Sequence, residues 1–187
     1  MIVSRALLEW PLVAAMTAAF GTSAFVIASA GDRAYDVSSA ASFLMPLWRT
    51  AAIAALILSP LVAIDIVATM AGVPWREAMP FVRDVIMQTH AGRVWQVYFP
   101  ALLILVLVAF VPMRSSRRTI SIVAISALML YLEAMLSHAT DKGMLAISVY
   151  FVHELGAGLW FGALLAFWTI SRRGNASSRA APSAKRS

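Results

Sequence analysis

Five apolar stretches, each long enough to cross a lipid bilayer, dominate this sequence. They run approximately over residues 7–30, 47–71, 94–111, 119–136 and 144–170. A spanning α-helix needs roughly 20 mainly apolar residues, and Gly, Pro or basic residues end each stretch. Because no water in the bilayer core can pair with the backbone, each span must satisfy its own polar groups, as a helix does. The sequence therefore predicts an all-α, polytopic transmembrane bundle of about five spanning helices.

The composition agrees with a membrane solvent. Hydrophobic residues make up 61% of the chain and charged residues 13%, and the mean hydropathy is +0.80. A soluble domain is nearer 45–50% apolar and about 25% charged, so this apolar excess cannot be enclosed in one globular core. We therefore expect one membrane domain over residues 1–174. Residues 175–187, which are mainly Ala, Ser, Pro, Arg and Lys, are predicted to form a disordered basic tail.

Two local patterns add detail to this outline. Residues 75–88 mix charged with large apolar side chains, which is typical of a short helix lying at the membrane interface. In the last span, Gly158 and Gly162 form a small-xxx-small pattern, which lets two helices approach closely.

The distribution of basic residues predicts the orientation. The side that holds the first and third connections and the C-terminus carries ten of the 15 Lys and Arg residues. The positive-inside rule then places the C-terminus in the cytoplasm and the N-terminus outside. Ala28-Ser29-Ala30 resembles a signal-peptide cleavage site. However, the preceding apolar stretch is long for a signal peptide, and cleavage would put the basic tail outside, so a retained span is favoured.

Several functions lack their sequence signals. The chain has no cysteine, so disulfides, thiolate metal sites and cysteine nucleophiles are excluded. It also has no Walker phosphate loop, no H-E-x-x-H and no Gly-x-Ser-x-Gly motif. The net charge of +6 comes from short loops and the tail and not from a basic-aromatic surface. We therefore expect neither an enzyme nor a nucleic-acid-binding protein.

Ionisable side chains inside or beside the spans are the most informative residues. In the predicted topology, all three histidines and four acids fall in the outer half of the membrane. These residues are Glu9, Asp65, His90, Glu133, His138, His153 and Glu154. Intramembrane acids and histidines are costly and usually functional, so their gathering on one side predicts a site there.

The residue types in this half of the membrane suit a soft metal. Met135 lies three residues before His138, which places both on one face of a continuous helix. Imidazole with thioether suits copper, and Cu(I) in particular. We predict that His90, His138, His153 and Met135 bind the metal, with Asp65, Glu133 and Glu154 in support. His138 and His153 are expected to converge across the short connection that joins the last two spans.

Alternatives to this metal site stay open. Methionines in membrane proteins are mostly packing residues, a loop histidine such as His90 can be merely solvated, and the acids can pair with other helices. Two histidines could instead ligate haem b in an electron-transfer protein. A purely structural subunit of a larger complex is a third alternative.

Three segments resemble the copper resistance D (CopD) family of inner-membrane proteins. Residues 89–95, Thr-His-Ala-Gly-Arg-Val-Trp, resemble its T-x-x-G-x-x-W segment, and residues 137–139 resemble its Ser-His-Ala. Residues 153–164 resemble the family's H-x6-W-x-G-G-L helix. The resemblance implies copper uptake, or delivery of copper from the periplasm, with the lipid bilayer, a copper ion and a periplasmic copper-binding protein as partners.

Overall fold

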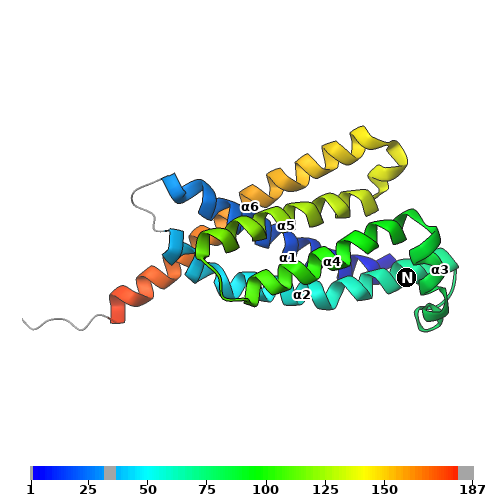
Figure 1. The fold of residues 1–187 in the computed structure, drawn as a ribbon, viewed down its shortest axis with the longest axis horizontal. Coiled ribbons are helices and arrows are strands. Elements are labelled where there is room, and N and C mark those ends of the chain that lie inside the picture. The colour runs from blue at the N-terminus through cyan, green and yellow to red at the C-terminus, as the bar shows by residue number, and fades with distance from the viewer. Residues whose placement is uncertain (1, 32–36, 181–187) are drawn as a thin grey trace, which may run out of the picture.

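Five long α-helices form a bundle, and a short helix lies across one of its ends (Figure 1). The computed structural model describes residues 2–31 and 37–180. The long helices are α1 (Ile2–Ala28), α2 (Val37–Ala71), α4 (His90–Phe110), α5 (Ser115–Leu136) and α6 (Met144–Ala180). Each contains a segment long and apolar enough to span a membrane. Within the described residues there is no strand, and the prediction of an all-α bundle with five spans is confirmed.

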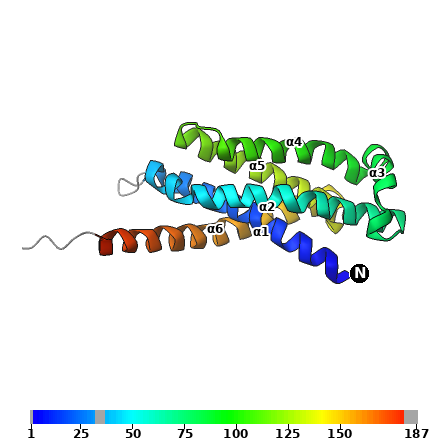
Figure 2. The same ribbon diagram turned by 90° about the horizontal axis from the view of Figure 1, so that it is seen from below.

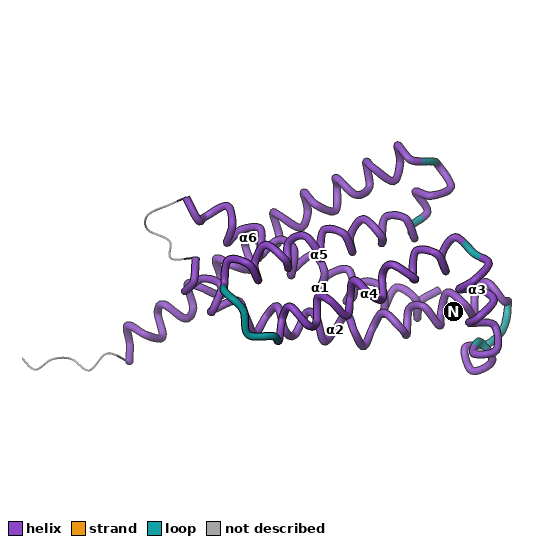
Figure 3. Tube along the Cα trace, viewed as in Figure 1, coloured by secondary structure: helices purple, strands orange, loops and turns teal. Residues whose placement is uncertain are grey.

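Successive long helices run in opposite directions, so all connections gather at two ends (Figures 1 and 2). One end, called the α3 end below, holds the start of α1, the end of α2, α3 (Val82–Gln88) and the α5–α6 connection. The other, the tail end, holds the α4–α5 connection and the end of α6. Within the described residues the loop segments are short, as Figure 3 shows, and each long helix packs against the next one.

The segment predicted to form an interfacial helix folds as a series of short turns. It consists of two 3₁₀ turns, Trp75–Glu77 and Met79–Phe81, followed by α3. The Thr89 side chain caps the next helix, because its hydroxyl oxygen accepts a hydrogen bond from Gly92 N at 3.0 Å. This cap ends α3 and starts α4 at His90.

Two helices extend ten residues beyond their predicted bounds. α2 begins at Val37, ten residues before the predicted start, and contains Pro46 and Pro60. Proline usually ends a helix because it lacks the N–H, but neighbouring helices in a membrane bundle can compensate the lost hydrogen bond. α6 continues to Ala180, so the predicted tail begins inside a helix. Residues 181–187 lie outside the described residues.

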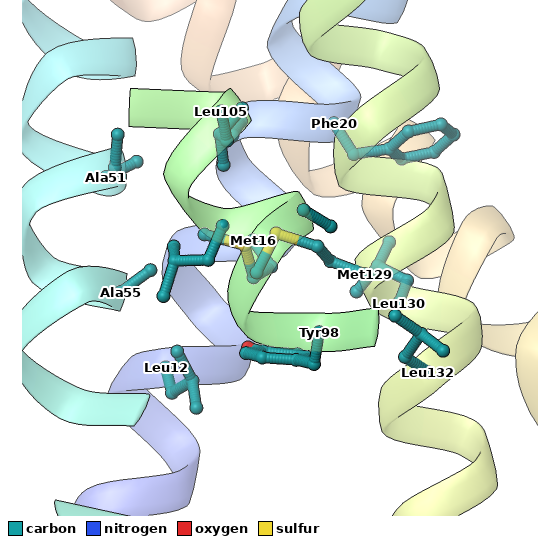
Figure 4. Close-up of a cluster of buried hydrophobic side chains, with 14 of the residues drawn as sticks. Leu12, Met16, Phe20, Ala51, Ala55, Tyr98, Leu105, Met129, Leu130 and Leu132 are labelled. Atoms are coloured by element: carbon teal, nitrogen blue, oxygen red, sulfur yellow. The ribbon is translucent and has the colours of Figure 1, made fainter. Parts of the chain in front are cut away.

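α1 is the central element of the bundle. It packs against α2, α5 and α6, and its Met16 is fully buried beside Met129 of α5 (Figure 4). The Trp48 indole of α2 donates a hydrogen bond to Thr22 Oγ1 of α1 at 2.9 Å. The helix that resembles a signal peptide therefore supplies a large part of the core.

Glycines bring α1 and α6 into backbone contact. A Cβ atom built on Gly21 would overlap the backbone of Gly158, and one built on Gly162 would overlap the backbone of Gly21. Because only hydrogen atoms fit between these backbones, the small-xxx-small pattern of the last span acts as predicted. The contact fixes where α6, the helix that bears His153, crosses α1.

Candidate metal-binding cavity

A cavity of about 1520 Å³ opens between the helices toward the α3 end. Five helices contribute to its wall, together with the connection between α5 and α6. Its ionisable lining residues are Glu9, Asp65, Tyr98, Glu133, His138, Lys142, Tyr150, His153 and Glu154. Four carboxylates face a single lysine, so the lining favours a cation.

The polar groups at the inner part of the cavity are organised around Tyr98 of α4. Its side chain is only 2% exposed, and its hydroxyl lies 3.4 Å from Ser59 Oγ of α2. Ser59 can donate its one hydrogen either to the Tyr98 oxygen or to the Ala55 carbonyl oxygen, which lies 2.7 Å away. The Glu133 carboxyl of α5 is the second hydrogen-bonding neighbour of the Tyr98 hydroxyl. One phenol thus joins three helices.

Three glutamates from three helices share this space. Glu133 lies within electrostatic range of Glu9 on α1 and of Glu154 on α6. The Tyr150 hydroxyl is a hydrogen-bonding partner of the Glu154 carboxyl. Like charges in a poorly solvated cavity repel strongly. A cation placed among these carboxylates would relieve that repulsion.

His138 and His153 both line the cavity. His138 lies in the α5–α6 connection, and His153 lies in α6. His138 begins the 3₁₀ helix His138–Lys142, whose Ala139 N–H donates to Ser137 Oγ at 3.2 Å. Thr140 Oγ1 donates to the Met135 carbonyl at 2.6 Å and ties this turn to α5. Both imidazoles are exposed, so a ligand can reach them.

His90 and Met135 contact one another beside the cavity and are not part of its wall. The His90 Nε2–H donates to the Met135 carbonyl oxygen at 3.2 Å. The Met135 side chain is partly buried and packs against the hydrophobic core. Helix α5 ends at Leu136, and Ser137 adopts an extended conformation (φ −80°, ψ 168°). The helical relation expected between Met135 and His138 therefore does not hold.

The structure thus brings part of the predicted site together. The cavity gathers His138, His153 and the supporting acids Asp65, Glu133 and Glu154. Across the described residues, no three His, Asp or Glu side chains lie close enough together to hold a metal ion. A ready-made site with three such ligands is therefore not formed, whereas a two-imidazole site needs only the histidines of the cavity.

The sequence analysis did not single out Tyr98. The signal was present, because a tyrosine in the middle of an apolar span needs a partner for its hydroxyl. Lys142 and Tyr150, which also line the cavity, were missed because neither belongs to a recognisable motif.

Comparison with known proteins places this geometry in a family. The family model for the copper resistance protein D-like, N-terminal domain matches residues 2–147. The match covers α1 to α5 and the start of α6, and it ends before His153. No curated protein and no solved structure matches the chain. Because the match covers well over half of the sequence, the chain belongs to the copper resistance protein D-like family.

Proposed function

We propose that this protein binds copper in the membrane and takes it up, transports it or delivers it from the periplasmic side, without catalysing a reaction. The observation that carries the proposal is a single cavity lined by His138, His153 and four carboxylates, in a chain of a copper-resistance family. Copper here is cargo, so a site that holds it weakly enough to release it suits the role.

The cavity chemistry fits Cu(I) as the cargo. Imidazole nitrogen suits copper, and Cu(I) accepts two or three ligands without strict geometry. His138 and His153 would supply the direct ligands. The carboxylates of Glu133 and Glu154 are harder donors, so they would act through their charge and lower the energy of a cation at this depth. Tyr98 would hold Glu133 in place through its hydroxyl.

His90 has a different role in this proposal. Because its Nε2–H donates to a carbonyl oxygen, its Nδ1 carries the lone pair and can meet a metal ion. His90 is exposed and lies outside the cavity wall. It would therefore make the first contact with incoming copper, and Met135 would position it through the backbone.

The direction of access follows from charge. The ten-to-five excess of basic residues at the tail end supports an α3 end that faces the periplasm. Copper would then reach the cavity from that side, where a periplasmic copper-binding protein could donate it.

The test is copper movement by the full-length protein in sealed proteoliposomes that contain a copper indicator. Cu(I) accumulation should exceed that of protein-free vesicles. His153→Ala should lower the accumulation about tenfold, since one of the two imidazole ligands is lost. The proposal would be contradicted if the purified protein bound no copper and vesicles that contain it accumulated none.

The haem alternative gains no support from the family match. A visible spectrum of the purified protein addresses it directly. Bound copper without a Soret band is the expected result. A Soret band that disappears in the His138→Ala variant would show that the protein binds haem in place of copper.

A further inference from the structure

Four of the five exposed methionines among the described residues lie at the α3 end. Met70, Met79, Met87 and Met144 are 53%, 63%, 67% and 64% exposed. Met70 lies at the end of α2, Met79 and Met87 lie in the turns that lead into α4, and Met144 begins α6. Met70, Met79, Met87 and Met144 are called the thioether face below. By contrast, Met113 at the tail end is 36% exposed, and Met16 and Met129 are buried in the core.

Methionine replaces the usual aliphatic residues at this end of the bundle. In the middle of the spans, the exposed aliphatic side chains of the described residues are Leu, Ile and Val, as at Ile57, Leu103 and Leu128. In the two connections at the α3 end and the two helix residues on either side of each, methionine occupies four of the five exposed large aliphatic positions, and Leu145 is the fifth. Contact with lipid is served as well by Leu or Ile, so it does not account for this preference.

The thioether face borders the cavity described above. Met70 adjoins Thr69 and Gly72, and Met144 adjoins Leu145; these three neighbours line the cavity. Met87 lies three residues before His90, whose ring contacts the Met135 carbonyl next to the connection that bears His138. The thioether face therefore lies in segments that adjoin the lining of the cavity at the α3 end.

We propose that Met70, Met79, Met87 and Met144 form a Cu(I)-collecting surface that captures the monovalent ion through thioether sulfur and passes it to the cavity. This inference rests on the proposed function, because it names how that cavity is loaded. Thioethers select Cu(I) over the hard divalent cations. A single exposed thioether binds weakly and exchanges quickly, so several around one opening raise the local concentration of Cu(I) without trapping it.

The direct test follows the methionine methyl groups by NMR in the full-length protein. The chain is labelled with [methyl-¹³C]methionine, placed in lipid nanodiscs and titrated with Ag(I), a closed-shell probe with the ligand preference of Cu(I). Single Met→Leu variants assign the signals and keep side-chain volume nearly constant. The four signals of the thioether face should move at an Ag(I) concentration about tenfold below that needed for Met113.

Two results would overturn the inference. One is a Met113 signal that moves together with the four, because the affinity would then be that of any accessible thioether. The other is the absence of movement in the four. Failure of the proposed function looks different, since His138→Ala/His153→Ala would then bind copper as tightly as the wild type, whatever the methionine signals do.

Kinetics supply a second measurement. In a variant with all four methionines of the thioether face changed to Leu, Cu(I) loading of the cavity should slow about fivefold or more, with equilibrium occupancy unchanged. Met113→Leu is the matched control and should load at the wild-type rate. Equal loading rates in the fourfold variant and the wild type would contradict the proposed surface.

Discussion

Tyr98 connects three of the helices that line the cavity through its hydroxyl. Its ring is buried, and its hydroxyl meets Ser59 of α2 and Glu133 of α5. Tyr98→Phe removes these contacts and leaves the packing, so it should lower the free energy of unfolding by about 0.5–1.5 kcal/mol. Tyr131→Phe is the control, because Tyr131 packs through its ring, whose centroid lies 5.3 Å from that of Phe151. The substitution keeps this ring contact. Unfolding of both variants in detergent measures the difference, and equal stability would mean that the Tyr98 hydroxyl is not engaged.

Glu133 has both other glutamates of the cavity as electrostatic neighbours. Glu133→Gln removes one of three neighbouring glutamate charges and keeps the shape of the side chain. Copper should bind about three- to tenfold more weakly, because part of the attraction is lost, while the fold is at least as stable, because repulsion falls. Glu77→Gln lies in an exposed turn at the same end and should leave the affinity unchanged. The same loss of affinity in both variants would show a general surface-charge effect and not a role for the cavity.

At the scale of the elements, the contact between α1 and α6 determines where the cavity wall stands. Gly21→Ala would push its methyl group into the backbone of Gly158, an overpacking that costs about 1–3 kcal/mol. The matched control is Gly156→Ala on α6, where an added Cβ meets nothing within 4 Å. Thermal unfolding should show a clear loss for Gly21→Ala and none for Gly156→Ala. Two variants as stable as the wild type would contradict the close packing of these helices.

The elements were largely predictable, and their ends were not. Long apolar runs predict the five spans because lipid allows few alternatives to a helix. Pro46 suggested a start near residue 47, yet α2 begins at Val37, since tertiary contacts in a bundle outweigh the local effect of proline. Similarly, the sequence could not show that α5 ends at Leu136, which separates Met135 from His138.

The candidate site was only partly predictable for a related reason. Hydropathy gives the depth of a residue along a span, and depth correctly indicated that His138, His153, Asp65 and Glu133 share one half of the bundle. Which way each helix is rotated about its axis depends on packing that a single sequence does not reveal. That rotation puts the His90 ring on a carbonyl oxygen of α5 and turns the Met135 side chain to the core.

At the scale of the whole molecule, the orientation in the membrane decides which compartment the cavity meets. The excess of basic residues at the tail end predicts a periplasmic α3 end. A reporter fused after Ser187 should be active only in the cytoplasm, and one inserted near Lys142 should be active only in the periplasm. The reverse pattern would place the cavity on the cytoplasmic side and exclude direct supply of copper from the periplasm.

The measurement that tests the central claim most directly is a Cu(I) titration of the purified full-length protein and its histidine variants. His138→Ala/His153→Ala should lose the copper that the cavity holds, with affinity reduced about a hundredfold or more, because both imidazole ligands of the cavity are gone. His90→Ala is the matched control and should keep the equilibrium affinity, since His90 lies outside the cavity wall. If the double variant keeps its helical content and binds Cu(I) as tightly as the wild type, the cavity is not the copper site.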